Sequence, residues 1–153
     1  MNTVYELLGN DSLNMELTHF DKVISKISQS QGSGERDDNS KFFSNNWMPF
    51  VMAALYGFRH GISRPLSGER KTDVFKFLQI YRGSEQLFKL LILNVVNIHG
   101  YQVLDDRQKI RKTIEEYANG GFYYLSEQIN SNEKFLDVTD FLEFITEFQN
   151  LDN

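Results

Sequence analysis

The sequence predicts an all-α fold, a compact single-domain bundle of about six or seven helices around a central apolar helix at Leu87–Ile98. Apolar residues recur at spacings of three and four along most of the chain, and Leu87–Ile98 is apolar nearly all the way round. Polar cap residues and glycines stand at the ends of these stretches. The length of 153 residues favours one domain, and 13 Phe, 7 Tyr and 1 Trp supply a core without disulfides, because Cys is absent.

The first 45 residues divide into two parts. A helix is expected from about Ser12 to Ser28, with one apolar stripe formed by Leu13, Leu17, Phe20, Ile24 and Ile27. We treat residues 1–30 as a helical arm of the same domain, since an isolated helix of this length is marginal in water. Residues 31–45 are rich in Ser, Gly, Asn and charge, and therefore predict a flexible connection to a main body at 46–153.

The main body is expected to begin with a helix and a basic loop. Asn45 or Asn46 can cap the helix, and Gly57 weakens its end. The segment from Gly57 to Lys71 contains further Gly and Pro residues and predicts an exposed loop. Thr72–Tyr81 suits either a helix or a short strand, and we favour the helix.

Ser84 is the expected cap of the central helix, which should stop at Gly100. Asp105 or Asp106 opens the next helix, which the pair Gly120–Gly121 is expected to end.

Two further helices complete the prediction. Phe122–Ile129 forms a short separate helix. Asp137 or Thr139 caps a last helix that turns Phe side chains inward and glutamates outward.

Charge is unevenly distributed along the chain. Residues 59–112 contain 11 Lys and Arg against 5 Asp and Glu, a net of +6, so the remainder must carry −11 for the chain to total −5. A local positive field attracts phosphates even on an acidic protein, while the acidic remainder repels them and orients the encounter. This asymmetry favours an anionic partner.

The candidate nucleic-acid-binding residues form two clusters in the sequence: Arg59, His60, Arg64, Arg70 and Lys71 in the loop, and Arg107, Lys109, Arg111 and Lys112 at the start of a helix. Arginines and glycines on a loop held by a rigid scaffold commonly serve recognition. The alternative for the loop cluster is ion pairing with the acidic C-terminal helix. The alternative for the helix cluster is an ordinary solvated face, partly neutralised by the two preceding aspartates.

The three histidines give little sign of chemistry. None has a His, Asp or Glu partner at metal-ligand spacing such as HxxxH or HxH, so we expect no metal site. His99 is expected to bond terminal carbonyls at the end of the central helix, and His19 lies on a helix edge with no partner. His60, in the basic loop, is the one histidine to test as an acid, a base or a phosphate contact.

Signatures of catalysis are also missing from the sequence. There is no GxSxG motif, neither Ser63 nor Ser67 begins an SxxK motif for a serine nucleophile, and there is no GxxxxGK[ST] loop for phosphates. The carboxylate pairs Asp37-Asp38, Asp105-Asp106 and Glu115-Glu116 are interpreted as solvated charge or caps. The aromatic residues around Trp47 and Phe122 are assigned to core packing rather than base stacking. We therefore expect no catalytic residue and no cofactor, and a protein that is not an enzyme.

The start of the chain lacks a basic flank followed by an apolar run, and the most apolar stretch is too short for a membrane span. We expect a cytoplasmic protein without membrane contact.

Three segments of the main body resemble a known family. They are Trp47–Phe58, Arg64-Pro65-Leu66 and Glu115–Phe122. Between about Asn46 and Gln128, the order of these segments is similar to small accessory proteins encoded beside bacterial DNA phosphorothioation (Dnd) genes, the Dnd system-associated protein 4 type. The arm before Asn46 and the helix after Lys134 lie outside this resemblance. It implies a role near DNA modification, restriction or phage defence, and carries no established reaction.

We therefore expect a non-catalytic accessory component of a bacterial DNA-modification, restriction or antiviral defence system that binds DNA through the basic loop. The alternative is an adaptor that docks a larger enzyme of the same system without touching nucleic acid. A hydrolase or nuclease using His60 is a third hypothesis. A homo-oligomer is left open by the sequence.

Overall fold

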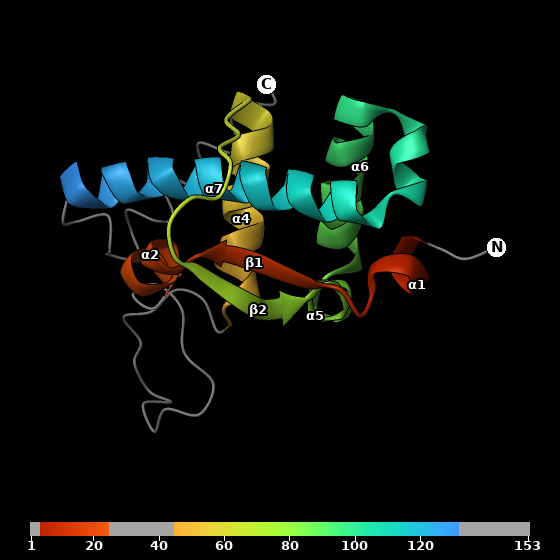
Figure 1. Cartoon of the computed structure of the whole chain (residues 1–153), viewed down its shortest axis with the longest axis horizontal. Coiled ribbons are helices and arrows are strands. Elements are labelled where there is room, and N and C mark those ends of the chain that lie inside the picture. Colours follow the sequence, from red (N-terminus) through yellow and green to blue (C-terminus); the bar gives the residue numbers. More distant parts are fainter. Residues whose placement is uncertain (1–3, 25–44, 132–153) are drawn as a thin grey trace.

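The computed structural model describes residues 4–24 and 45–131, which are mostly helical and include one two-stranded sheet (Figure 1). The elements in chain order are α1 (Val4–Leu8), β1 (Ser12–Glu16), α2 (Leu17–His19), the π-helix η1 (Phe20–Ile24), α4 (Trp47–His60), β2 (Arg70–Lys76), α5 (Phe77–Gly83), α6 (Glu85–His99), the 3₁₀-helix η2 (Tyr101–Asp105) and α7 (Arg107–Ser131). The mainly helical prediction is confirmed, and the purely all-α prediction is wrong.

The sheet replaces helix that was expected in two places. β1 pairs antiparallel with β2, with Leu13 opposite Phe75 and Met15 opposite Lys71, and the register is irregular between Leu13 and Met15. Leu13 and Met15 are both buried, as the two-residue period of a strand requires. The expected helix from Ser12 is therefore a strand for its first five residues, and Thr72–Tyr81 is strand up to Lys76 and helix only from Phe77.

The packing of α4 against α7 is the most extensive contact between two described elements, and Figure 1 shows α7 crossing α4. Glycines make the close approach possible. A Cβ on Gly57 would meet the Tyr117 carbonyl, and one on Gly121 would meet the Ala53 carbonyl. Both expected helix ends are therefore wrong. α4 continues to His60, where Gly61 (φ +65°) caps it, and α7 runs unbroken through Gly120–Gly121, so Phe122–Ile129 is no separate helix.

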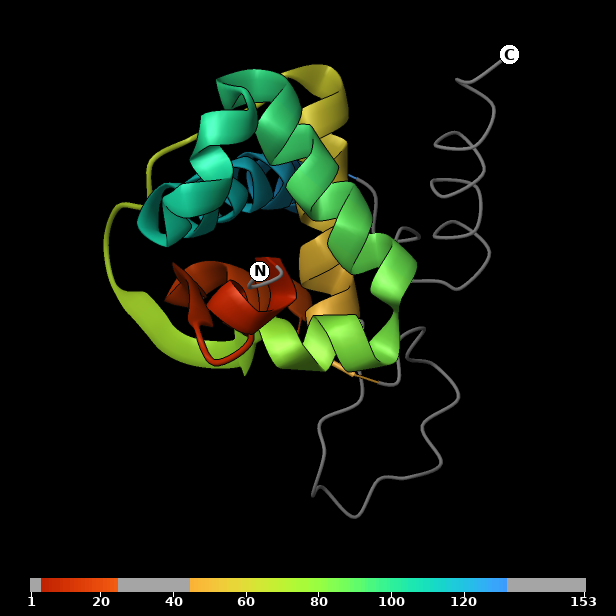
Figure 2. The same ribbon diagram turned by 90° about the vertical axis from the view of Figure 1, so that its right-hand side faces the viewer.

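α6 is not the centre of the fold, contrary to the prediction. Figure 2 shows it running from α5 to the turn before α7. One face is buried through Phe88, Leu91 and Val95, but Leu93 is 58% exposed and Leu90 42%. The core instead lies between α4, α7 and the sheet. There Phe50 contacts the rings of Phe75 and Phe122, which confirms the packing role of these aromatic residues.

The predicted starts of α4, α6 and α7 are correct. The side-chain oxygens of Asn45, Ser84 and Asp106 accept from the backbone N–H groups of Met48, Leu87 and Lys109. α6 ends at Gly100 as expected. The predicted connection at 31–45, apart from Asn45, and the helix capped by Asp137 or Thr139 lie outside the described residues. Within 4–24 and 45–131, no helix is long and apolar enough to cross a membrane.

Gly121→Ala is expected to destabilise the protein, by about 3 kcal/mol, because the new methyl group must push apart two helix backbones. In an open helix the same change would stabilise by about 1 kcal/mol. Urea unfolding followed by circular dichroism measures the effect, with Asn97→Ala on the exposed side of α6 as the control. A Gly121→Ala protein as stable as the parent would show that α4 and α7 do not meet at this point.

Candidate nucleic-acid interface

A cavity of about 410 Å³ lies between α7, strand β1 and the residues that lead into β2. We call it the cationic cavity. Its cations are Arg70 at the start of β2 and Arg111 and Lys112 on α7. The other lining residues are Asn14, Pro65, Leu66, Gln108, Glu115 and Glu116. The cavity thus brings together cations from both clusters that were predicted from the sequence.

The α7 cations face carboxylates one turn further along the helix. Arg111 Nε lies 3.9 Å from Glu115 Oε1, and Lys112 Nζ lies 3.9 Å from Glu116 Oε1. Both distances are near the upper limit for an ion pair, and the Lys112 side chain is 75% exposed. Exposed pairs of this kind contribute about 0–1 kcal/mol. Lys112 is therefore only weakly held by Glu116, whereas the Glu115 partner of Arg111 is itself buried.

The apolar part of the cavity comes from residues 61–69, which we call the α4–β2 connection. It crosses α7 in Figure 1, and the Arg64 N–H donates to the Glu116 carbonyl at 3.0 Å. Asn119 Nδ2 donates to the carbonyls of Arg64 (3.1 Å) and Pro65 (3.3 Å), and Arg70 Nη2 donates to the Leu66 carbonyl (3.3 Å). These bonds hold Pro65 and Leu66 in place beside the cations.

Behind this connection lies a polar network, the Glu16–His19 network, formed by Glu16, His19, Ser67, Asn119 and Tyr123. His19 Nε2 lies 2.9 Å from Asn119 Oδ1 and 3.1 Å from Glu16 Oε2. Both oxygens can only accept, so Nε2 carries the hydrogen. Glu16 Oε1 also accepts from the Tyr123 hydroxyl at 3.1 Å and from the Ser67 N–H and hydroxyl at 3.2 Å. The network joins β1 and α2 to the connection and to α7.

Three groups near the cavity have shifted pKa values. Burial lowers the pKa of His19 more than Glu16 and Asn119 raise it, so the ring is neutral near pH 7. Burial raises the pKa of Glu16, but hydrogen bonds from Ser67 and Tyr123 and the nearby His19 outweigh it, so the net shift is downward. Burial raises the pKa of Glu115 more than the Asn14 N–H and the cations Arg111 and Arg70 lower it.

The nine predicted site residues do not form one cluster. Arg70, Arg111 and Lys112 line the cavity, and Arg107 and Lys109 belong to the first turn of the same helix. The Arg64 guanidinium lies 3.8 Å above the Tyr123 ring, and Lys71 Nζ lies 4.1 Å from the centre of the Phe20 ring.

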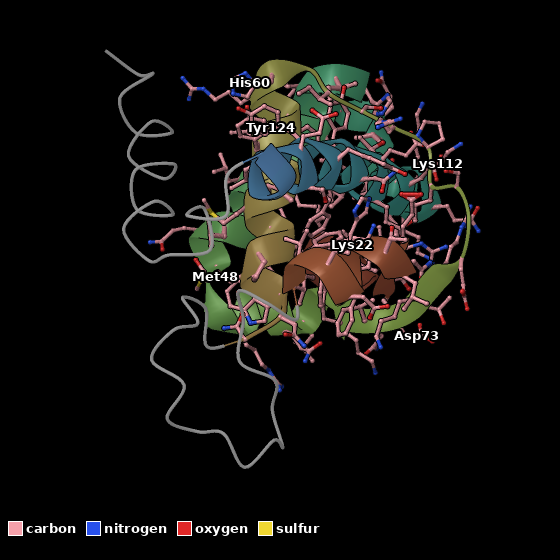
Figure 3. All side chains as sticks on the ribbon, turned by 90° about the vertical axis from the view of Figure 1, so that its left-hand side faces the viewer. Lys22, Met48, His60, Asp73, Lys112 and Tyr124 are labelled. Atoms are coloured by element: carbon pink, nitrogen blue, oxygen red, sulfur yellow. The ribbon has the colours of Figure 1, made fainter. Side chains whose placement is uncertain are left out.

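Arg59 and His60 belong to the end of α4 rather than to a loop. Figure 3 places His60 near Tyr124 at the top of the view and Lys112 at the right edge. The basic loop was therefore predicted too long at its start, and also at its end, because Arg70 and Lys71 belong to β2.

The histidines behave differently from the prediction. His19 is buried between Glu16 and Asn119, so the expectation of a partnerless His19 is wrong. His99 Nε2 lies 2.9 Å from the Thr113 hydroxyl and so links α6 to α7, a structural role through Thr113 rather than the expected carbonyls. The His60 ring lies 4.3 Å from the Tyr56 ring, between ring centres, and is tilted by 36° to it. Among the described residues, no three His, Cys, Asp or Glu side chains are placed to hold a metal ion.

Sequence reasoning missed the Glu16–His19 network and the burial of Glu115. Glu115 was interpreted as solvated charge, yet it is 8% exposed and its Oε1 accepts from the Asn14 N–H at 2.9 Å. The one available signal was the spacing of Glu16 and His19, three residues apart. Asn119 and Tyr123 are about a hundred positions away, and no local pattern connects them.

Comparison with protein families gives a match to the model described as DNA sulphur modification system-associated protein 4, over residues 32–150. The match is longer than the resemblance seen in the sequence, because it includes residues 32–45 before it and extends past Lys134 to residue 150. It leaves out residues 1–31, and with them Glu16 and His19. No curated protein and no solved structure matches the chain.

The burial of His19 predicts a loss of stability in mild acid. The pKa of His19 in the folded state lies below its usual value of 6.5, so the unfolded chain binds the proton more tightly. The stabilisation is present above that value and is lost as the pH falls through the folded pKa. Urea unfolding at about pH 7.5 and about pH 5.5 should show a smaller loss of stability for His19→Gln than for the parent.

His60→Gln is the matched control, because His60 is exposed. An unchanged pH dependence in His19→Gln would contradict the assignment of a buried neutral ring.

Proposed function

Because the chain belongs to the DNA sulphur modification system-associated protein 4 family, we propose that it is a non-catalytic accessory protein of a bacterial DNA-modification or defence assembly. Its task is to bind the phosphate backbone of DNA at the cationic cavity. The observation that carries this proposal is the meeting of Arg70 with Arg111 and Lys112 in one cavity, although they lie about forty positions apart in the chain. Phosphate contacts from Arg and Lys are the usual source of affinity for DNA.

The arrangement of charge supports this proposal. Lys109 lies three positions before Lys112 and Arg107 four before Arg111, so the same helix side continues the positive strip beyond the cavity. Arg107 Nη1 lies 3.8 Å from Asp11 Oδ1, with its side chain 58% exposed. Since the whole chain has a net charge of −5, the positive strip attracts an anion locally while the rest of the protein repels it. An anionic polymer would therefore be bound in one orientation.

The buried groups support binding rather than catalysis. His19 and Glu16 are each 3% exposed and are engaged by Asn119, Ser67 and Tyr123. A general base must reach the proton that it removes, and this histidine faces the inside of the network. Its effect on a ligand would be indirect, through the position of the α4–β2 connection.

Removing two cavity cations, in the variant Arg111→Ala/Lys112→Ala, should weaken DNA binding and reduce its dependence on salt. The slope of the logarithm of affinity against the logarithm of salt concentration is expected to become shallower by roughly 0.9 for each lost phosphate contact. Glu116→Gln should act in the opposite direction, because it removes the carboxylate 3.9 Å from Lys112. Fluorescence anisotropy with labelled duplex and single-stranded DNA over a salt series measures both effects.

Arg82→Ala on α5 is the matched control, since Arg82 is exposed and outside the cavity lining. If Arg82→Ala weakens binding as much as the loss of one cavity cation, the attraction is general and the cavity is no site. If the parent protein binds neither form of DNA at low salt, the proposal fails.

A second candidate function, contact with a larger protein of the same system, is supported by a different feature. An apolar cavity of about 500 Å³ lies along α6 and η2, and its lining includes Phe88, Leu93 and Tyr101. Tyr101 is 80% exposed and Leu93 58%. Large exposed apolar side chains beside a cavity are typical of protein–protein contact sites.

For this candidate, Leu93→Glu is expected to abolish co-purification with the partner protein from the native host, because it places a charge in an apolar contact. Asn97→Glu on the same helix, outside the cavity lining, adds the same charge and should leave co-purification intact. Co-purification that survives Leu93→Glu would exclude this surface as the contact.

A further inference from the structure

We propose that the cationic cavity distinguishes a phosphorothioate from an ordinary phosphate in the DNA backbone. The charge would be held by Arg70, Arg111 and Lys112, and the sulphur would lie against Pro65 and Leu66. This inference rests on the proposed DNA-binding function and adds the ligand class of that same site.

The chemistry of the ligand sets what such a site must contain. A phosphorothioate diester keeps the single negative charge of a phosphate, but sulphur replaces one non-bridging oxygen. Sulphur is larger and more polarisable than oxygen and accepts hydrogen bonds only weakly. Sulphur therefore loses less hydration free energy than oxygen when it moves from water to an apolar surface. A site that reads the difference needs cationic donors on one side of the phosphorus and an apolar surface on the other.

The cationic cavity has both sides. The donors lie on α7 and at the start of β2, while Pro65 and Leu66 lie on the connection that crosses α7. Leu66 is half-buried, and its carbonyl is occupied by the Arg70 guanidinium at 3.3 Å. The Leu66 carbonyl thus has Arg70 as its partner, and Leu66 and Pro65 are the apolar residues of the cavity lining. A purely electrostatic phosphate site would have no need of this apolar surface.

The apolar surface is held before any ligand arrives. Asn119 binds the Pro65 carbonyl, and Glu16 binds the N–H and hydroxyl of Ser67, on either side of Leu66. Preorganisation matters here because the two ligands differ in one atom. A surface that could withdraw would accept either ligand equally, whereas a fixed surface favours the ligand whose less hydrated atom meets it.

The carboxylates in the cavity add to the selection. Glu115 and Glu116 lie 3.9 Å from Arg111 and Lys112, so an entering diester must replace carboxylate oxygens and give up water. The phosphorothioate binds water less tightly than the phosphate, so its desolvation costs less free energy. The phosphorus atom becomes a stereocentre when sulphur is present. Only one of the two diastereomers can turn sulphur to Leu66 while its oxygen faces the cations.

The test uses the full-length protein and three short duplexes of one sequence. One duplex carries only phosphates, and the other two carry a single phosphorothioate of opposite, defined configuration. Affinities are measured by fluorescence anisotropy at one salt concentration. We expect one diastereomer to bind several-fold more tightly than both the other diastereomer and the unmodified duplex.

Variants separate the two sides of the cavity. Leu66→Asn should reduce the ratio of affinities for modified and unmodified DNA toward one, and Leu66→Met, which keeps an apolar surface, should retain it. Arg111→Ala should weaken binding of all three duplexes and leave the ratio of their affinities unchanged. Circular dichroism and a thermal melt check that each variant is folded.

The outcomes distinguish this inference from the proposed function. If all three duplexes bind equally with the expected salt dependence, the proposed DNA binding stands, and the inference that the cavity distinguishes phosphorothioate from phosphate is overturned. Equal preference for both diastereomers over the phosphate duplex overturns the fixed apolar surface as its cause. If no duplex binds, the proposed function fails and this inference fails with it.

Discussion

The position of the candidate site depends on the hydrogen bonds of one side chain, the amide of Asn119. Its Oδ1 accepts from His19 Nε2, and its Nδ2 donates to the carbonyls of Arg64 and Pro65. One amide thus binds α2 on one side and the α4–β2 connection on the other, from a position on α7 that is 3% exposed. A buried polar group left without a partner costs about 1–3 kcal/mol, so each of these groups constrains the others. In the described part of the chain, every buried side-chain nitrogen and oxygen has a hydrogen-bond partner.

The glycines of α7 complement this amide. Gly120 and Gly121 follow Asn119 directly, and a Cβ at either position would meet the backbone of Ile62 or Ala53. The absence of side chains lets the connection and α4 lie against the α7 backbone. The close contact between Gly120 and Ile62, together with the hydrogen bonds from Asn119 to the α4–β2 connection, thus fixes Pro65 and Leu66 against α7. The position of the cavity is a consequence of backbone packing, and its positive charge is supplied separately by Arg70 of β2 and by Arg111 and Lys112 of α7.

The parts of the fold that could be predicted are those with a local cause. A cap residue followed by a periodic apolar stretch predicted the starts of α4, α6 and α7 correctly, because the bond from Ser84 or Asp106 is made three residues away. β1 and β2 could not be predicted in this way, because the strands pair residues that are far apart in the sequence, such as Leu13 and Phe75. Gly120–Gly121 was misinterpreted for a related reason. A glycine that ends a helix and one that admits a neighbouring backbone look alike until the neighbour is known.

The candidate site shows the same division. Residue type alone predicted which side chains are cationic, and both clusters contribute to the cavity. Arg59 and His60 were grouped with Arg70 because they are near in sequence, yet they end a helix and Arg70 begins a strand. The network was invisible because Glu16 and Tyr123 lie 107 positions apart. Polar residues that satisfy one another across the fold leave no periodic pattern in the sequence.

The N-terminal segment has a distinct role in this arrangement. The family match begins at residue 32, so the cations and the α4–β2 connection belong to the matched part, while Glu16 and His19 do not. Asn14 from the same segment lines the cavity and donates its N–H to Glu115, the buried carboxylate beside Arg111. Residues 12–19 therefore hold the α4–β2 connection through Glu16 and His19, and through Asn14 they hold Glu115, the carboxylate 3.9 Å from Arg111. A segment that places no cation in the cavity lining in this way still fixes the position of residues that line it.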